Sequence, residues 1–262
     1  MSKVFLKPNK TDGGDSCVEI EHQDGGVAVL LLSKPPVNTF DVEMARSLST
    51  AIQALQRDER VKAIVLMSKN PKVMSGGMDL NVMYEPVEAE FRELWEAFED
   101  TTKRLYTFNK PTIVAISGKA PAASAVLSLH CDYRYASKNA SIGFNEAQLN
   151  IALPSWLLTN AERIVGGKNA ERMLQLGPMM TAEQALQIGL VDKVAEDYDG
   201  VKSLAIQEAK RMGKLWTIAS ATVKENQHKN IAKLFNKESV DYMWGQFSSQ
   251  PVQEKFAAFF KK

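Results

Sequence analysis

The sequence predicts an α/β fold built on a parallel sheet. Short apolar runs typical of buried strands alternate with segments of helical periodicity, beginning in the order strand, helix, strand. This is the order of a βαβ unit, in which the crossover is right-handed and the two strands are parallel. From about residue 198 the pattern is helical only. The 262 residues are therefore expected to form an α/β core over residues 1–197 and a helical segment over residues 198–262.

The first βαβ unit is predicted over residues 27–67. The apolar run Val27–Leu32 indicates a buried strand, which Pro35 ends. Asp41 can cap a helix over about 42–57, where apolar residues recur at helical spacing. The apolar run Ala63–Met67 follows as the next strand.

The same alternation continues further along the chain. We expect a helix over about 88–107, a strand at Thr112–Ser117, an apolar stretch at Ala122–Leu129, a strand at Asp132–Ala136, and helices at Ala170–Leu176 and Ala182–Ile188. Gly177 and Gly189 follow the last two segments. Glycine favours the backbone conformation that ends helices, so these two boundaries are well defined.

Composition and charge exclude several classes of function. Hydrophobic residues make up 45% and charged residues 24% of the chain, as in soluble globular proteins. No apolar run approaches the roughly 18 residues of a membrane-spanning helix. Lys and Arg number 32 against 31 Asp and Glu, a net charge of +1, so we expect neither nucleic acid nor an anionic membrane as a partner.

No metal site or hydrolase triad is expected. His22, His130 and His228 show no metal-ligand spacing and no serine-elbow motif beside them. Cys17 and Cys131 lie in unlike contexts without a second pair, which favours a reducing compartment. The first residues lack the apolar core of a secretory signal and the chain ends in FFKK, so no targeting signal is evident.

Two turns that follow predicted strands are candidate ligand sites. In Met74–Leu80 the paired glycines Gly76 and Gly77 either form a plain turn or bring backbone N–H groups close to a ligand. In Gly118–Ala125 the small residues after Pro121 indicate either tight packing or a helix start with free N–H donors. Turns at the carboxyl ends of strands in an α/β sheet form the crevice where ligands bind.

The third candidate is Glu146, in the segment Ser141–Leu149. Apolar residues flank its carboxylate on both sides. Such a glutamate is either a solvated surface residue or a desolvated acid/base with a raised pKa. The residues alone leave both interpretations open.

In this order and spacing, the three segments resemble those of the crotonase (enoyl-CoA hydratase/isomerase) superfamily, and the resemblance runs from about residue 18 to the end. Further matching stretches are Pro35–Asn38, Asn109–Gly118, Cys131–Arg134 and Ala182–Val194. The segments Lys72–Leu80 and Ile142–Ile151 are most similar to those of mitochondrial-type Δ3,Δ2-enoyl-CoA isomerases.

The resemblance implies a crotonase (ClpP-like) spiral of ββα units over residues 1–197, which holds the CoA and acyl site. Residues 198–262 would be a helical trimerisation segment, giving a homotrimer or a dimer of trimers. The implied substrate is an acyl-CoA thioester, so CoA is part of the substrate and no separate cofactor is expected. The implied location is the mitochondrial matrix, with a peroxisome-like organelle as the alternative.

In the family, two backbone N–H groups bind the thioester oxygen, and they correspond to Met78 and Ala123 here. The three glycines of the family's second motif are Ala122, Ala123 and Ser124 in this chain. A backbone donor survives such a change, but an added methyl group narrows the space beside the thioester. Family analogy also places CoA and substrate contacts at Ser75, Gly76, Gly77, Met78, Asp79, Leu80 and Asn145, although Asp79 also suits a helix cap.

The carboxylates narrow the implied chemistry. Family hydratases use two glutamates, and the first corresponds to Val126 here, while dienoyl-CoA isomerases and a related dehalogenase place a carboxylate at the position of Pro154. Glu146 alone remains, and one base suffices to move a proton from C2 to C4 of a 3-enoyl-CoA. The resemblance therefore implies isomerisation of cis- or trans-3-enoyl-CoA to trans-2-enoyl-CoA in fatty-acid β-oxidation. An enoyl-CoA hydratase and a non-catalytic crotonase-fold binding protein are the alternatives.

Overall fold

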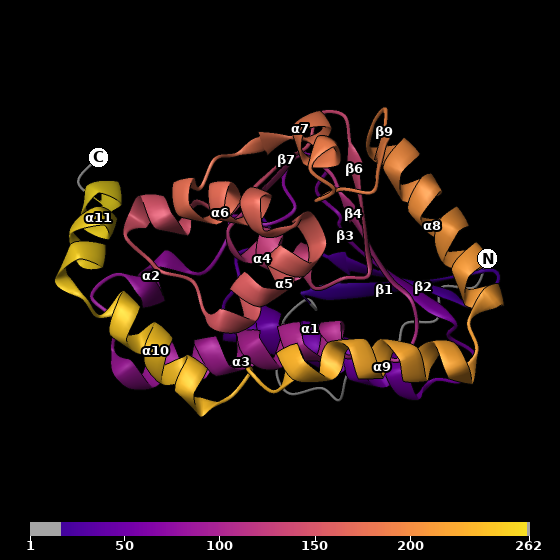
Figure 1. The fold of residues 1–262 in the computed structure, drawn as a ribbon, viewed down its shortest axis with the longest axis horizontal. Coiled ribbons are helices and arrows are strands. Elements are labelled where there is room, and N and C mark those ends of the chain that lie inside the picture. The colour runs from indigo at the N-terminus through magenta and orange to yellow at the C-terminus, as the bar shows by residue number, and fades with distance from the viewer. Residues whose placement is uncertain (1–16, 261–262) are drawn as a thin grey trace.

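The computed structural model describes residues 17–260, which form two sheets surrounded by helices (Figure 1). The larger sheet has the strand order β1 (Val18–Gln23), β2 (Val27–Leu32), β3 (Ala63–Ser68), β4 (Thr112–Ile116), β6 (Tyr133–Ser137) and β9 (Lys193–Ala195). Its strands from β2 to β9 are parallel, and β1 pairs antiparallel with β2. The smaller sheet has the order β5 (Lys119–Pro121), β7 (Ser141–Gly143) and β8 (Met180–Thr181).

The helices account for most of the rest of the described chain. They are α1 (Val42–Arg57), α2 (Leu80–Met83), α3 (Glu88–Tyr106), α4 (Ala123–Leu129), α5 (Ser155–Val165), α6 (Gly167–Leu176), α7 (Ala182–Gln187), α8 (Tyr198–Leu215), α9 (Ile218–Ala232), α10 (Lys237–Phe247) and α11 (Gln250–Phe260), with a 3-10 helix η1 (Asn145–Leu149) between β7 and α5. The helical run predicted from residue 198 is confirmed as α8 to α11.

The predicted βαβ unit is confirmed as β2, α1 and β3. β2 and β3 pair in parallel along their whole length, and both are fully buried, which explains their unbroken apolar sequences. Asp41 caps α1, because its Oδ1 accepts a hydrogen bond of 2.9 Å from the backbone N–H of Met44. The strand predicted at Asp132–Ala136 is observed as β6, which begins one residue later, where its pairing with β4 begins.

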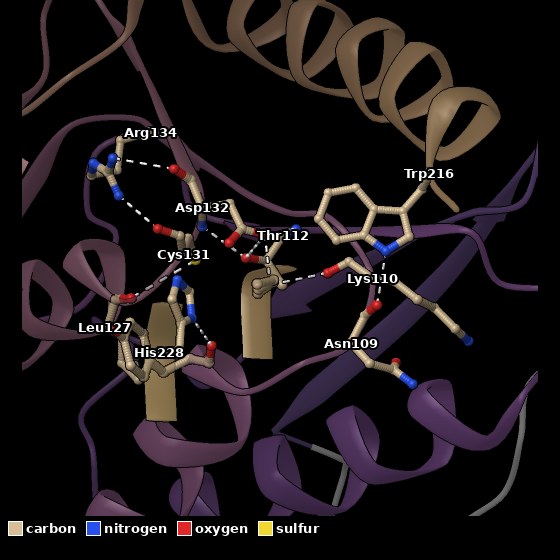
Figure 2. A network of polar contacts seen from close by, with 11 residues as sticks. Asn109, Lys110, Thr112, Leu127, Cys131, Asp132, Arg134, Trp216 and His228 are labelled. Atoms are coloured by element: carbon tan, nitrogen blue, oxygen red, sulfur yellow. Dashed lines mark hydrogen bonds and ion pairs between the residues drawn. The ribbon is translucent and has the colours of Figure 1, made fainter. Parts of the chain in front are cut away.

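Asp132 anchors the amino ends of β4 and β6 in a network of polar contacts (Figure 2). Its Oδ2 accepts hydrogen bonds from the backbone N–H of Thr112 at 2.8 Å and from Lys224 Nζ of α9 at 2.7 Å. The Lys224 side chain is 7% exposed, so this ion pair lies inside the protein. Arg134, also buried, donates to the carbonyl oxygens of Cys131 and Leu190. The Cys131–Arg134 stretch therefore stabilises the fold at the strand ends that lie away from the candidate motifs.

The two faces of the large sheet are covered by different parts of the chain. On one face, alternate residues of the central strands pack beneath Val201, Ala205, Ala209 and Met212 of α8. On the other face, the remaining strand residues pack with α1, α3 and α4 in the main core. Figure 1 shows α8 on one side of the sheet, with α1, α3 and α9 on the other. Trimerisation through residues 198–262 and the division after residue 197 stay predictions.

Candidate active site

Backbone pairing brings the three candidate segments side by side. Val73 forms an isolated parallel bridge with Lys119, in which Met74 N donates to Lys119 O at 2.8 Å. Two residues further on, Pro121 pairs with Gly143 in the β5–β7 ladder. The backbone N–H of Ala122 also donates to the Gly143 carbonyl at 2.9 Å. One continuous set of hydrogen bonds thus joins all three segments.

In the first segment, the backbone N–H of Met78 is free. A parallel bridge joins Phe40 to Met78, with Phe40 N donating to Gly77 O at 2.8 Å and Asp79 N donating to Phe40 O at 2.9 Å. Because the N–H and C=O of a trans peptide point in opposite directions, the Met78 N–H points away from Phe40. It has no acceptor among residues 17–260. A free N–H on a half-buried turn is a donor available to a ligand oxygen.

In the second segment, the free donor is Ala123. It is the first residue of α4, so its N–H has no partner within the helix, and the described part of the chain supplies none from outside. An ideal Cβ placed on Gly77 would lie 3.8 Å from the Cβ of Ala122, so the two turns are in contact. The structure therefore places both predicted backbone donors in adjoining turns.

Ala122 itself has a strained backbone. Its φ is +47° and its ψ is −120°, a region that glycine enters freely and residues with a Cβ avoid. This is the position where the family's pattern has glycine. The sequence alone indicated either tight packing or a helix start here, and it gave no sign of strain in the backbone dihedral angles.

Replacing Ala122 with glycine is expected to raise the free energy of unfolding by about 1 kcal/mol. Relief of the positive φ is worth about 1–3 kcal/mol, and the greater entropy of glycine in the unfolded chain takes back about 0.4–1 kcal/mol. Urea unfolding measures the difference. Ala125→Gly, the same replacement at a buried position inside α4, is the control and should destabilise by about 2 kcal/mol, from helix propensity and the lost methyl burial. A loss of stability in both variants would contradict the strain at Ala122.

In the third segment, Glu146 is buried with one oxygen unused. The residue is 9% exposed, in η1, and its Oε2 has no hydrogen-bond partner within the described residues. Burial raises the pKa of Glu146 to about 7, against the smaller, opposite effect of the residue's own backbone hydrogen bond. Such a carboxyl group exchanges a proton near neutral pH, which suits an acid/base catalyst. The burial of Glu146 excludes the interpretation as a solvated surface residue, and its role as an acid/base stays a prediction.

Close packing holds η1 in place. Gly177 follows α6 with a φ of +61°, and a Cβ there would lie 2.9 Å from the Phe144 carbonyl oxygen. Gln148 Nε2 donates to Gly177 O at 2.7 Å, and Ile151 N donates to Glu146 O at 3.0 Å. These contacts fix the backbone on both sides of the Glu146 side chain. Asn145 lies in the same turn, and its buried Oδ1 has no partner in residues 17–260.

The other residues predicted to contact the substrate differ in their exposure to solvent. Gly76 and Leu80 are exposed, and Gly77 is buried. The Asp79 side chain caps α2 by accepting from Asn81 N at 2.9 Å, as its capping interpretation predicted. The Ser75 side chain is buried and engaged with the protein, so only its backbone is available for a ligand.

No second carboxylate stands at either position where the resemblance would place one. Val126 is a buried residue of α4, and Pro154 precedes the first turn of α5.

The sequence did not single out the other buried glutamate, Glu99 of α3. Its Oε1 accepts hydrogen bonds from Trp95 Nε1, Trp156 Nε1 and Ser239 Oγ at 2.8, 3.1 and 2.6 Å. Glu99 therefore joins α3, α5 and α10, and burial raises its pKa against the effect of these donors.

Two cavities lie elsewhere on the molecule. One, of about 480 Å³, lies between α1 and α3, and the other, of about 550 Å³, lies beside α9. Neither is lined by the three segments.

Among residues 17–260, no helix is both long enough and apolar enough to cross a bilayer.

Comparison with known proteins finds relatives over about 70% of the chain. The chain is 37% identical to the mitochondrial enoyl-CoA delta isomerase 1 of Rattus norvegicus over 184 residues, and equally identical to the Homo sapiens protein over 196 residues. These matches cover 70% and 74% of this chain but only 63% and 65% of the relatives' own length. The short-chain-enoyl-CoA hydratase of Clostridium acetobutylicum is 29% identical, with 68% of each chain covered.

The predicted fold class is confirmed by a solved structure. The crystal structure of human mitochondrial delta3-delta2-enoyl-CoA isomerase superposes with a TM-score of 0.88 at 30% identity, covering 94% of this chain and 97% of that one. The enoyl-CoA hydratase of Bacillus halodurans shares the fold, with a TM-score of 0.84 at 22% identity. Residues 22–258 match the enoyl-CoA hydratase/isomerase family. The chain belongs to the enoyl-CoA hydratase/isomerase family.

Proposed function

We propose that the protein converts cis- or trans-3-enoyl-CoA into trans-2-enoyl-CoA, as part of fatty-acid β-oxidation. The observation that supports this most directly is Glu146, a buried carboxyl group with a free oxygen, a pKa near 7 and no second acid at Val126 or Pro154. Hydration needs a water molecule to be activated and split, whereas a 1,3-proton shift needs a single base.

In the proposed reaction, the Glu146 carboxylate takes a proton from C2 of the substrate. The electron pair of that C–H bond moves into the thioester, forming a dienolate whose negative charge lies on the carbonyl oxygen. The free N–H groups of Met78 and Ala123 donate to this oxygen, and one such preorganised donor is typically worth about 3–4 kcal/mol to the transition state. The Glu146 carboxyl group then returns the proton at C4, which leaves the double bond between C2 and C3.

The remaining expectations are part of the same proposal. CoA would lie along the backbone from Ser75 to Leu80, with Asn145 beside the acyl thioester. The mitochondrial names of the mammalian relatives support a matrix location, and the bacterial relatives leave other compartments open. A homotrimer or dimer of trimers, with no resident cofactor or metal, stays a prediction.

The test is a direct comparison of two reactions. Purified protein should convert cis- and trans-3-hexenoyl-CoA to the trans-2 product, and it should hydrate crotonyl-CoA at least about 100-fold more slowly, since one acid/base group is worth about 10²–10⁴-fold in rate. Hydration at a rate comparable with isomerisation would replace the isomerase by a hydratase. Binding of CoA esters with neither reaction would favour the non-catalytic alternative.

A further inference from the structure

The free N–H of Met78 belongs to a segment that is held along its length by residues 37–40. Gly76 N donates to Val37 O at 2.7 Å, just before the bridge between Phe40 and Met78. Gly76 and Val37 are also closely packed, since a Cβ on Gly76 would lie 2.9 Å from Val37 Cγ2. Residues 37–40 therefore act as a template against which the turn at residues 75–79 is shaped.

The Ser75 hydroxyl group completes this template. Ser75 is fully buried, and its Oγ donates to Asn38 O at 2.6 Å while accepting from Gly77 N at 3.0 Å. Gly77 has a φ of +99°, so the turn depends on how its two flanking peptide planes are held. Ser75 fixes the plane before Gly77, and Phe40 fixes the plane after it. The second of these planes contains the Met78 N–H.

Asn38 in turn fixes the template. It is 3% exposed and has a φ of +52°, a conformation that asparagine tolerates better than most residues. Its Oδ1 accepts from Lys34 N at 2.7 Å, and its Nδ2 donates to Ser68 Oγ at 2.8 Å and to Met74 O at 3.0 Å. One side chain thus joins the loop before α1, the end of β3 and the residue before Ser75.

We infer that Ser75 and Asn38 are positioning residues whose side chains aim the Met78 N–H at the thioester oxygen without themselves touching the substrate. The inference rests on the proposed function, because it assigns Met78 to the oxyanion site. Preorganisation is what gives such donors their effect, since a donor that must reorient during the reaction loses most of its advantage. A misplacement of about 1 Å can cost about 100-fold in rate.

Ser75→Ala is the main test. It removes both hydrogen bonds of Oγ and is expected to lower kcat for 3-hexenoyl-CoA by about 10- to 100-fold, with KM changed less than about threefold. Ser117→Ala is the matched control, because Ser117 is equally buried but its Oγ has no partner among the described residues. That variant should keep the wild-type kcat. Ser75→Cys, which retains a weak donor and acceptor, should lie between wild type and alanine.

A spectroscopic readout separates positioning from simple structural support. Infrared difference spectra of bound hexanoyl-CoA carrying a ¹³C-labelled thioester carbonyl report the hydrogen bonds to that oxygen without turnover. The wild-type protein and Ser117→Ala should shift the carbonyl band to lower frequency, and Ser75→Ala and Asn38→Asp should shift it less. Lower thermal stability with unchanged kcat and an unchanged band shift would overturn the inference.

The same measurement distinguishes the two levels of the proposal. If the wild-type protein binds hexanoyl-CoA but does not isomerise 3-hexenoyl-CoA, the proposed reaction fails. A band shift that still depends on Ser75 would then support the positioning role for another reaction of the thioester. If isomerisation is observed and the Ser75 and Asn38 variants match the wild type in both readouts, the positioning role alone is wrong.

Discussion

Glu146→Gln is expected to lower the rate of 3-enoyl-CoA isomerisation by on the order of 10³-fold or more, because an amide can neither take the C2 proton nor return it at C4. Glutamine has nearly the same shape, and the free Oε2 leaves no hydrogen bond to break. The variant should therefore fold and bind hexanoyl-CoA as the wild type does. Single-turnover assays with 3-hexenoyl-CoA measure the effect on the chemical step.

The same replacement should stabilise the protein at alkaline pH. Burial raises the pKa of Glu146 from 4.5 to about 7, so the folded state binds this proton more tightly than the unfolded state does. The stabilisation from the protonated group is complete below about pH 4.5 and is lost as the pH rises to about 7. Glutamine does not titrate, so at pH 8 Glu146→Gln should be more stable by up to about 3 kcal/mol. Urea unfolding at pH 8 and pH 5 should show this advantage shrinking at the lower pH.

The pH dependence of the wild-type rate follows from the same group. The base must be ionised to accept a proton, so kcat/KM should fall about tenfold per pH unit below a pKa near 7 and level off above it. Glu99→Gln is the matched control, since Glu99 is also buried with a raised pKa but is bonded to Trp95, Trp156 and Ser239. The Glu99→Gln variant should show the same dependence of kcat/KM on pH as the wild type, including the plateau above about pH 7. Undiminished turnover in Glu146→Gln would remove Glu146 from the mechanism.

The elements that the sequence predicted well are those whose signal is local. β2 and β3 are buried on both faces and read as apolar runs, and α1 has a capping aspartate and a regular apolar stripe. The strand β1 was not predicted, because only two of its six residues, Val18 and Ile20, are apolar, and most of the strand is only half-buried at the edge of the sheet. The strands β5, β7 and β8 have two or three residues each, too few for a period to show.

The candidate site depends on pairings between distant residues, which a local pattern does not contain. The sequence suggested that turns at strand ends would meet, but the contacts that join them connect Val73 to Lys119 and Pro121 to Gly143. The apolar residues beside Glu146 made it a candidate with two open interpretations, and family resemblance favoured the acid/base role. Its burial in the fold accounts for the raised pKa, which the sequence did not show. The template at residues 37–40 could be found only from its hydrogen bonds.

Gly118→Ala is expected to destabilise the protein by more than about 4 kcal/mol, among the larger effects of a single substitution. Gly118 has a φ of +64°, and a Cβ placed on it would lie 2.0 Å from the carbonyl oxygen of Lys72. The crowded atom belongs to the backbone, so no side chain can move aside. Relief requires residues 72–74 to separate from Lys119, which breaks the Lys119 N to Lys72 O and Met74 N to Lys119 O hydrogen bonds.

A graded series of glycine replacements isolates this contact. Gly166 has a φ of +75° and a ψ of 153°, a backbone region essentially confined to glycine, with no atom within 4 Å of an added Cβ. Gly166→Ala should therefore lose only the roughly 1–3 kcal/mol of backbone strain. Gly167 is equally uncrowded without a positive φ, and in α6 alanine should stabilise by up to about 1 kcal/mol. The free energy of unfolding measured in urea should therefore be far lower for Gly118→Ala than for the other two variants. Any Gly118→Ala protein that folds should also lose isomerase activity, because the broken pairing is the one that holds Met78 beside Ala123. A loss of unfolding free energy no greater than that of Gly166→Ala would show that residues 72–74 and Lys119 are not closely paired.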